Sequence, residues 1–482
     1  MARYILQDNI ALRSWSDIPY ACCVRGKLYP RTLSKKEFLT MLRCDGTEEL
    51  DASPVLEKLL TEGLIREAAS DVEALSSWQE YEYFGNDFFP FATLEITERC
   101  NYNCRHCFNA ADSGALSAEL SLAEIEQVLD ELRACGVQNV KLTGGEPTLR
   151  PDFPEIVRAI REKELYLYSI NTNGAFLTDE FLRLIRENGF SPIMKISFDG
   201  IGFHDWMRGR AHAEERTLEA IRRCIARGFC VMVQMNMNRR NLDAILPSLD
   251  HLEALGVWLT RLIRTTEAPR WDRHAGGDCL SWKEYFDRSL EIAKSYAGDK
   301  RSMLLDFWMF LTLDVPGRSF RCDKIRSADN GDFMDRWLCR ERIDVGADGM
   351  LYPCLQMSGW MKAHGVRLGD VKKTPLKELL RDSEYARFIG RRVRDKTEVN
   401  EQCAGCPVLP YCRGGCPAIS ILTGGGPLGR DEASCLFFGE RYYERIKAAF
   451  PDFHDLSPMP ENLNTAYLNR ITGRHGAEQR SR

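Results

Sequence analysis

Residues 93–265 alternate between short apolar segments and amphipathic segments, and this alternation restricts the fold more than any other feature. Six segments are candidate strands: TLEIT, NVKLT, LYSINT, IMKISFD, CVMVQMN and WLTRLIRT. Between them, apolar residues recur three and four positions apart, as in SLAEIEQVLDELRAC, DEFLRLIREN and AEERTLEAIRRCIARG, which indicates helices. Strands that alternate with helices predict an α/β fold with a parallel sheet and right-handed crossovers.

Polar and glycine-rich pieces follow the first four candidate strands. These pieces are residues 100–107, the turn GGEP at residues 144–147, NTNG after the third strand and DG after the fourth. The carboxyl ends of parallel strands meet at one edge of a sheet, where α/β folds bind their ligands. We therefore expect these pieces to form one site.

The eighteen cysteines point to bound metal. The opening MARYILQDNIALRSW lacks the basic start and apolar core of a signal peptide, and no apolar stretch approaches the roughly 20 residues that span a bilayer. We expect a cytoplasmic protein without a membrane partner, whose cysteines stay reduced and gather around metal. Seven cysteines are scattered in apolar surroundings and are interpreted as small buried side chains: Cys22, Cys23, Cys44, Cys135, Cys224, Cys230 and Cys279.

Charge argues against a nucleic-acid partner. Lys and Arg number 65 and Asp and Glu number 70, giving a net charge of -5, and no run of basic residues is long enough to follow a phosphate backbone.

Cys100, Cys104 and Cys107 form the first cysteine group, in the loop that follows the first strand. Three thiolates can hold three irons of a cubane and leave the fourth iron open to an outside ligand. A zinc site is the alternative. Structural zinc prefers four protein ligands, and His106, between two of the thiols, is awkwardly placed to be the fourth.

With the GGEP turn after the second strand, this cysteine spacing resembles the radical S-adenosylmethionine superfamily over about residues 93–265. The resemblance implies a partial (β/α)6 TIM-like barrel. It also implies that the open iron binds S-adenosylmethionine (SAM), whose cleavage gives a 5'-deoxyadenosyl radical that removes a hydrogen atom from the substrate.

The same resemblance implies which residues hold SAM. The glycines of the turn would let backbone groups approach the methionine ammonium, with Glu146 as a structural partner. Ser197 matches the ribose position, and Arg208 matches the carboxylate position, for which a planar, permanently charged fork is suited. The full set is Gly144, Gly145, Glu146, Pro147, Ser197 and Arg208.

A second group of cysteines resembles the extension called SPASM, which holds two auxiliary 4Fe-4S clusters in its relatives. The resemblance assigns Cys339, Cys354 and Cys416 to the nearer cluster, and it assigns four others to the farther one: Cys403, Cys406, Cys412 and Cys435. A zinc ribbon is the alternative, but a reducing radical enzyme needs an electron route.

The nearer auxiliary cluster lacks one ligand. Some relatives have a cysteine six residues before the Cys339 position, where this chain has Phe333. Cys322 is the best substitute. Its alternatives are a buried structural thiol or an open iron that binds a substrate thiolate.

We divide the chain into six parts by their sequence patterns. Residues 1–75 resemble the small winged-helix domain related to PqqD that grips leader peptides, and a helical cap is the alternative. We expect a linker at 76–92, the radical SAM core at 93–265, a helical bridge at 266–320 (SWKEYFDRSLEIAKSY and SMLLDFWMFLTL), the iron-sulfur domain at 321–440, and a C-terminal helix and tail at 441–482.

Together, the resemblances predict a maturase that cross-links a ribosomal precursor peptide through a thioether or carbon-carbon bond. The peptide's leader would add a strand to the N-terminal domain, and a flavodoxin or ferredoxin would supply low-potential electrons. The cofactors would be SAM and three 4Fe-4S clusters. The catalytic acid or hydrogen donor is not identifiable from the sequence.

Three other functions stay open. A peptide epimerase is the near variant. An anaerobic sulfatase maturase usually begins near the first cysteine group and has Asp after the cysteine matching Cys354, whereas here 99 residues precede that group and Leu355 follows that cysteine. A pure electron carrier would not need the open iron of a three-cysteine cluster.

Overall fold

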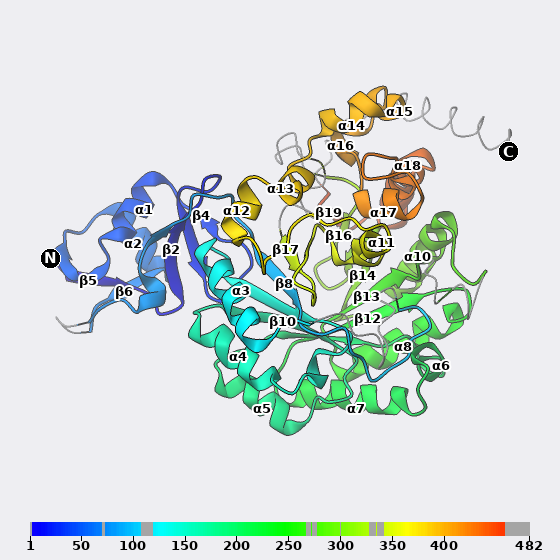
Figure 1. The fold of residues 1–482 in the computed structure, drawn as a ribbon, viewed down its shortest axis with the longest axis horizontal. Coiled ribbons are helices and arrows are strands. Elements are labelled where there is room, and N and C mark those ends of the chain that lie inside the picture. Colours follow the sequence, from blue (N-terminus) through cyan, green and yellow to red (C-terminus); the bar gives the residue numbers. More distant parts are fainter. Residues whose placement is uncertain are drawn as a thin grey trace.

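A twelve-stranded sheet forms the centre of the molecule, in the order β18-β17-β8-β9-β10-β11-β12-β13-β14-β15-β16-β19 (Figure 1). The computed structural model describes residues 2–69, 73–107, 119–266, 271, 277–298, 300–326, 334 and 342–457. All six predicted strands are present and parallel to their neighbours: β8 (Phe91–Glu95), β9 (Asn139–Thr143), β10 (Tyr166–Thr172), β11 (Ile193–Ser197), β12 (Val231–Met237) and β13 (Leu259–Arg264).

Helices connect these strands and cover one face of the sheet (Figure 1). The Ser121 and Thr178 side chains cap α3 and α5 by accepting backbone N–H groups in the first turn. Apolar side chains of strands and helices then bury each other in one continuous core. The helices are α3 (Leu122–Ala134), α4 (Phe153–Glu162), α5 (Asp179–Glu187), α6 (His204–Arg208), α7 (Ala213–Ala226) and α8 (Leu242–Leu255). This arrangement is the α/β class that the alternation predicts.

The prediction of a helix in the second half of the bridge at residues 266–320 is wrong. SWKEYFDRSLEIAKSY forms helix α10 (Trp282–Ala297), but SMLLDFWMFLTL forms two strands, β14 (Leu304–Phe307) and β15 (Leu311–Asp314). Met309 between them has a positive φ of 63°, which a continuing helix would not accommodate. β14 also pairs with the edge of β13, and a short apolar run fits a buried strand as well as a helix.

The cysteine-rich segment completes both edges of the sheet. β17 (Arg342–Val345) pairs in parallel with β8 and carries β18 (Leu351–Tyr352), while β16 (Ser319–Cys322) pairs with β15 and with β19 (His454–Asp455). Short helices from this segment lie above the barrel (Figure 1): α11 (Ser358–Ala363), α12 (Leu376–Arg381), α13 (Glu384–Ile389), α14 (Val393–Val399), α15 (Glu401–Ala404), α16 (Leu409–Cys412), α17 (Pro417–Leu422), α18 (Glu432–Gly439) and α19 (Tyr442–Ala449).

The N-terminal segment forms two small sheets, in the orders β5-β1-β6 and β4-β3-β2-β7. Trp15 stacks on Phe84 with ring centroids 5.6 Å apart, and Asn139 of β9 donates a 2.9 Å hydrogen bond to the carbonyl of Lys27. The hydrogen bond between Asn139 and Lys27 joins the segment to the central sheet. Its elements are β1 (Ala2–Leu6), β2 (Ile10–Ser14), β3 (Ala21–Val24), β4 (Arg31–Thr32), α1 (Lys35–Leu42), β5 (Asp45–Leu50), α2 (Pro54–Thr61), β6 (Ile65–Glu67) and β7 (Glu82–Tyr83).

Within the described ranges, no helix is long and apolar enough to span a bilayer.

Candidate active site

The turn at residues 144–147 holds the loop that leads into the first cysteine group. The amide of Gly145 donates to the carbonyl of Thr97 at 2.8 Å, and the amide of Glu146 donates to the carbonyl of Arg99 at 2.8 Å. A Cβ atom on Gly144 or Gly145 would collide with these two carbonyls. The glycines therefore allow the turn to approach the backbone just before Cys100, and other backbone groups of the turn remain for a ligand.

Glu146 joins the carboxyl ends of β9 and β10. Its buried carboxylate accepts hydrogen bonds from the Thr148 hydroxyl at 2.5 Å, the Thr172 hydroxyl at 2.8 Å and the Asn173 amide at 2.7 Å. Burial raises the pKa of Glu146 above its ordinary value. The side chain acts as a brace for the turn, and Pro147 begins the short 3-10 helix η2 (Pro147–Leu149).

The three thiols of the first group lie in a half-buried loop that α6 holds in place. Arg105 donates from its amide to the carbonyl of Met207 at 2.9 Å and from Nε to the carbonyl of Trp206 at 2.9 Å. Burial, with smaller contributions from Cys104 and Cys107, raises the pKa of Cys100 to about 12. Without a cation the Cys100 thiol would stay protonated, whereas bound iron favours its thiolate.

The three thiols of this loop do not converge on one point as the ligands of a single metal ion would. Among the described residues, no group of three or more His, Cys, Asp or Glu side chains could hold one metal ion. An iron-sulfur cubane spreads its cysteine ligands over several irons, so three thiols can serve it without converging on one point.

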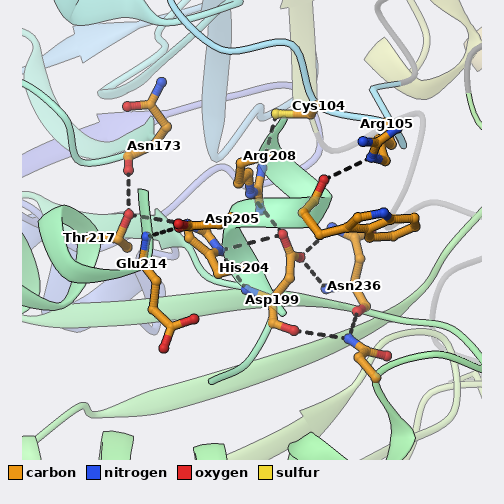
Figure 2. A network of polar contacts seen from close by, with 12 residues as sticks. Cys104, Arg105, Asn173, Asp199, His204, Asp205, Arg208, Glu214, Thr217 and Asn236 are labelled. Carbon is orange, nitrogen blue, oxygen red and sulfur yellow. Dashed lines mark hydrogen bonds and ion pairs between the residues drawn. The ribbon is translucent and has the colours of Figure 1, made fainter. Parts of the chain in front are cut away.

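Arg208 lies between the first cysteine group and Asp199 (Figure 2). Its Nη1 is 3.7 Å from the sulfur of Cys104, and its Nε is 2.7 Å from Oδ2 of Asp199. Both residues are buried. Burial opposes ionisation of Asp199, but the charge of Arg208 and the contributions of His204 and His106 together lower the pKa of the carboxyl.

One donor of Arg208 remains available. Within the described residues, its buried Nη2 has no hydrogen-bond partner, and a buried unpaired guanidinium donor is costly. An anionic ligand such as a carboxylate would satisfy it. The residues present therefore fit the carboxylate of SAM.

Sequence reasoning missed Asp199 as the partner of Arg208. Its Oδ1 accepts the amide of Asn236 at 3.0 Å, and its carbonyl accepts Nδ2 of Asn241 at 3.0 Å. Asp199 thus connects β11, β12 and the start of α8. The only sequence signal was the DG pair after the fourth strand.

Ser197 is the last residue of β11, two positions before Asp199. Its neighbour Ile196 is fully buried in the core, whereas Ser197 is partly exposed. Because side chains alternate along a strand, Ser197 points to the face opposite that core. It lies at the strand edge where the Arg208 and cysteine groups gather.

Four cysteines of the second group lie within electrostatic reach of one another. Burial raises the pKa of Cys412 to about 12, with further contributions from Cys435 and Cys406. Cys403 contributes to the raised pKa of Cys435, after burial as the main cause. The structure thus gathers the set assigned by resemblance to the farther cluster.

Cys354 and Cys416 each precede the first turn of a short helix. Cys354 leads into the 3-10 turn η5 (Leu355–Met357), and Cys416 leads into α17, which packs against η5. The positive end of a helix favours a thiolate. Asp431, a second residue that sequence reasoning missed, accepts the amide of Cys416 at 2.9 Å.

The remaining residues assigned to the nearer cluster are less fully defined. Cys339 and Phe333 lie outside the described residues. Cys322 is fully buried in β16, where its amide donates to the hydroxyl of Ser457 at 2.9 Å. Burial raises the pKa of the Cys322 thiol, and Asp455 and Asp323 raise it further.

Comparison with known proteins agrees with this geometry in two regions. Residues 94–252 match the family model described as the Radical SAM superfamily, and residues 337–407 match SPASM, an iron-sulfur cluster-binding domain.

Three relatives extend the comparison. Fe-coproporphyrin III synthase of Methanosarcina barkeri is 33% identical over 75% of this chain and 92% of that protein. The sporulation killing factor maturation protein SkfB of Bacillus subtilis is 27% identical over 53% of this chain and 60% of that protein. The structure of Streptococcus suis SuiB bound to the precursor peptide SuiA has a TM-score of 0.64 at 13% identity, covering 90% of this chain and 99% of SuiB.

Proposed function

Because this chain belongs to the radical SAM superfamily and has a SPASM extension, we propose that it is a maturase that cross-links a ribosomal precursor peptide. It is an enzyme that binds SAM and 4Fe-4S clusters. Cys100, Cys104 and Cys107 would hold the first cluster, at which bound SAM would supply, on reduction, the 5'-deoxyadenosyl radical that takes a hydrogen atom from the substrate. The chain's own residues then position the substrate and exclude water.

The observation that carries the peptide proposal is the shared fold with SuiB, whose structure holds its precursor peptide. The match covers 90% of this chain. The N-terminal 92 residues make up about a fifth of the sequence, so a match of this extent includes part of them. We infer that this segment grips a leader peptide, which would add a strand to an edge of one of its small sheets.

We assign the first cluster to Cys100, Cys104 and Cys107. The free Nη2 of Arg208 supports its pairing with the SAM carboxylate, and the position of Ser197 at the end of β11 supports contact with the ribose. The turn Gly144, Gly145, Glu146 and Pro147 would lie beside the methionine group, with Glu146 as its brace.

We further assign two auxiliary clusters to the cysteine-rich segment. The nearer would use Cys322, Cys339, Cys354 and Cys416, and the farther would use the four cysteines that share one electrostatic environment, Cys403, Cys406, Cys412 and Cys435. They would carry electrons between a flavodoxin or ferredoxin and the barrel, or remove the electron left on the product.

The product we propose is a thioether or carbon-carbon bond, with epimerisation as the near variant. A cross-link requires a net oxidation, and the auxiliary cysteines would hold a cluster able to serve as the electron acceptor. Formylglycine formation is less favoured, because Leu355 follows Cys354 and a long segment precedes the first cysteine group.

A tetrapyrrole is the second candidate substrate. Fe-coproporphyrin III synthase is 33% identical over 75% of this chain. About a quarter of the chain lies outside that match, whereas the shared fold with the peptide-bound SuiB covers 90%. We therefore place the peptide first.

Intact mass after anaerobic co-expression with a short peptide encoded beside the gene tests the proposal. We expect the peptide to lose two hydrogens, about 2 Da, with the wild-type enzyme. We expect no loss with Cys104→Ala, which removes a ligand of the first cluster but leaves the auxiliary cysteines. An unchanged mass without solvent deuterium uptake would contradict peptide maturation, and deuterium uptake alone would indicate epimerisation.

A further inference from the structure

Four basic residues occupy positions on the inner face of the barrel. Lys141 of β9, Lys195 of β11, Arg261 of β13 and Arg342 of β17 alternate with buried residues of the outer core, such as Leu142 and Ile196. Lys195, Arg342 and Arg261 all lower the pKa of Lys141, after burial as the main cause. The four cations therefore share one space inside the barrel.

Protein carboxylates accompany the two arginines. Arg261 Nε lies 2.5 Å from Oδ2 of Asp306, and Arg342 Nε lies 3.0 Å from Oδ2 of Asp344. Asp344 and Arg342 also lie near Cys354. Asp323 is close to Asp306 and Arg261, and burial raises its pKa to about 6. These carboxylates thus lie beside the two arginines.

The two lysines have no such partner. Among the described residues, neither Lys141 nor Lys195 forms an ion pair or a side-chain hydrogen bond. The Nζ atom of Lys141 lies 3.0 Å from the centroid of the Phe91 ring, and Asp344 acts on this lysine only through a weaker long-range attraction. When the two lysines are protonated, their charges therefore have no paired carboxylate among the described residues.

We infer a hollow beside the lysines from their partial exposure. Burial lowers the pKa of Lys195 to about 7 and that of Lys141 well below its ordinary value. Both side chains nevertheless remain partly accessible. Unpaired ammonium groups in such a space are costly, and an anion entering it would offset that cost.

The lysines lie one layer below the candidate SAM residues. Lys195 is two positions before Ser197 on β11, and Lys141 is two positions before Thr143, which Gly144 follows. A strand rises about 3.3 Å per residue, so each step is about 7 Å. A group bound to the lysines would lie between the barrel floor and the SAM site.

We propose that Lys141 and Lys195 bind a carboxylate of the substrate inside the barrel. Resting on the peptide function proposed above, this carboxylate belongs to an Asp or Glu side chain of the precursor. Holding it would fix the carbon atoms beside it near the SAM site, since a fixed anchor restricts which hydrogen faces the reacting group. The lysines are positioning residues for the substrate.

The first test asks whether the hollow binds a carboxylate, without using the reaction. Anaerobic holoenzyme at pH 7 is pulsed with acetic anhydride in rising glutarate or in its neutral analogue glutaramide. We expect glutarate alone to slow acetylation of Lys141 and Lys195 at least threefold and to saturate. The exposed Lys294 of α10 serves as the control. Equal effects of glutarate and glutaramide would overturn the proposal.

The second test identifies the source of the carboxylate. Each acidic residue of the precursor is replaced by its amide, and product formation is compared for wild type, Lys195→Met, Lys195→Arg and Lys294→Met. We expect one acidic-to-amide substitution in the peptide to lower product formation at least tenfold with wild type and with Lys294→Met. With Lys195→Met, the same peptide substitution should cause no loss beyond that of the enzyme variant itself. Lys195→Arg should restore part of the activity.

The outcomes separate this inference from the peptide function. If wild type modifies the peptide and still does so after each acidic residue is replaced, the proposal that a peptide carboxylate binds the lysines is wrong. If no peptide is modified, the peptide function fails, and the glutarate test still decides whether the hollow binds an anion. A third outcome is that coproporphyrin III protects the lysines from acetylation while no acidic-to-amide change in the peptide lowers product formation. That result would assign the carboxylate to a tetrapyrrole and overturn the peptide source.

Discussion

The Nε atom of Arg208 lies 2.7 Å from Oδ2 of Asp199, and both side chains are buried beside the first cysteine group. The same arginine faces Cys104 through Nη1, at 3.7 Å from the sulfur (Figure 2). Asp199 thereby fixes the direction of the guanidinium. The orientation leaves Nη2 for the ligand that we propose, the SAM carboxylate.

Replacing Asp199 by Asn is expected to weaken both the fold and SAM binding. Arg208 would remain charged and buried without its carboxylate, which costs about 3 kcal/mol. Denaturation of the holoenzyme should show this loss, and equilibrium dialysis should show SAM affinity falling at least tenfold. Asp243→Asn, at an exposed position in the first turn of α8, is the control. Equal SAM affinity in the two variants would refute the positioning role of Asp199.

Gly145→Ala tests the contact between the turn and the cysteine loop. The added methyl would collide with the carbonyl of Arg99, which directly precedes Cys100. Overpacking of this kind costs about 1–3 kcal/mol, and we expect the displaced loop to lose about four irons per chain. Iron analysis and 5'-deoxyadenosine formation are the measurements.

Gly85→Ala is the matched control for that change. No atom lies within 4 Å of a Cβ at Gly85, and its φ is not positive. Normal iron content in Gly145→Ala would show that the turn does not hold the loop.

The local sequence predicted the strands of the barrel but not every neighbour that they acquire. Each of the six strands has its own apolar pattern and is bounded by turn residues, so it is visible within a few positions. The pairing of β17 with β8 joins residues about 250 positions apart, and no local pattern reports it. The same applies to β14, whose strand form depends on the edge that β13 offers.

In the candidate site, too, local sequence patterns indicate some residues, and contacts between distant parts of the chain define the others. Cysteine spacing predicts the two cysteine groups, because cluster ligands recur at short intervals. Asp199 and Asp431 were missed because their roles depend on partners elsewhere in the chain, Arg208 in one case and the Cys416 amide in the other. Lys141 and Lys195 lie between apolar residues of two different strands, and one sequence does not show that they share a hollow.

Lys195 is expected to titrate near neutral pH. Burial lowers its folded-state pKa to about 7 from an ordinary 10.5, so the unfolded chain binds more protons between these values. The contribution of Lys195 to stability therefore increases as pH rises from about 7 to about 10.5. Pulsed acetylation should show its reactivity reaching half its maximum near pH 7.

Lys294 provides the exposed reference in that titration. Reactivity of Lys195 that rises in parallel with that of Lys294 at every pH would contradict the buried, unpaired state of the lysine.

Cys322→Ala tests the missing ligand of the nearer auxiliary cluster. If Cys322 binds iron, the variant should lose between about one and four irons per chain and change the electron paramagnetic resonance signal of one auxiliary cluster. The first cluster should remain, because its three cysteines belong to another loop. Cys224→Ala, which removes a buried thiol of α7, controls for loss of packing alone. Unchanged iron and signal, with unfolding destabilised by about 1 kcal/mol as in Cys224→Ala, would instead identify Cys322 as a structural thiol beside Ser457.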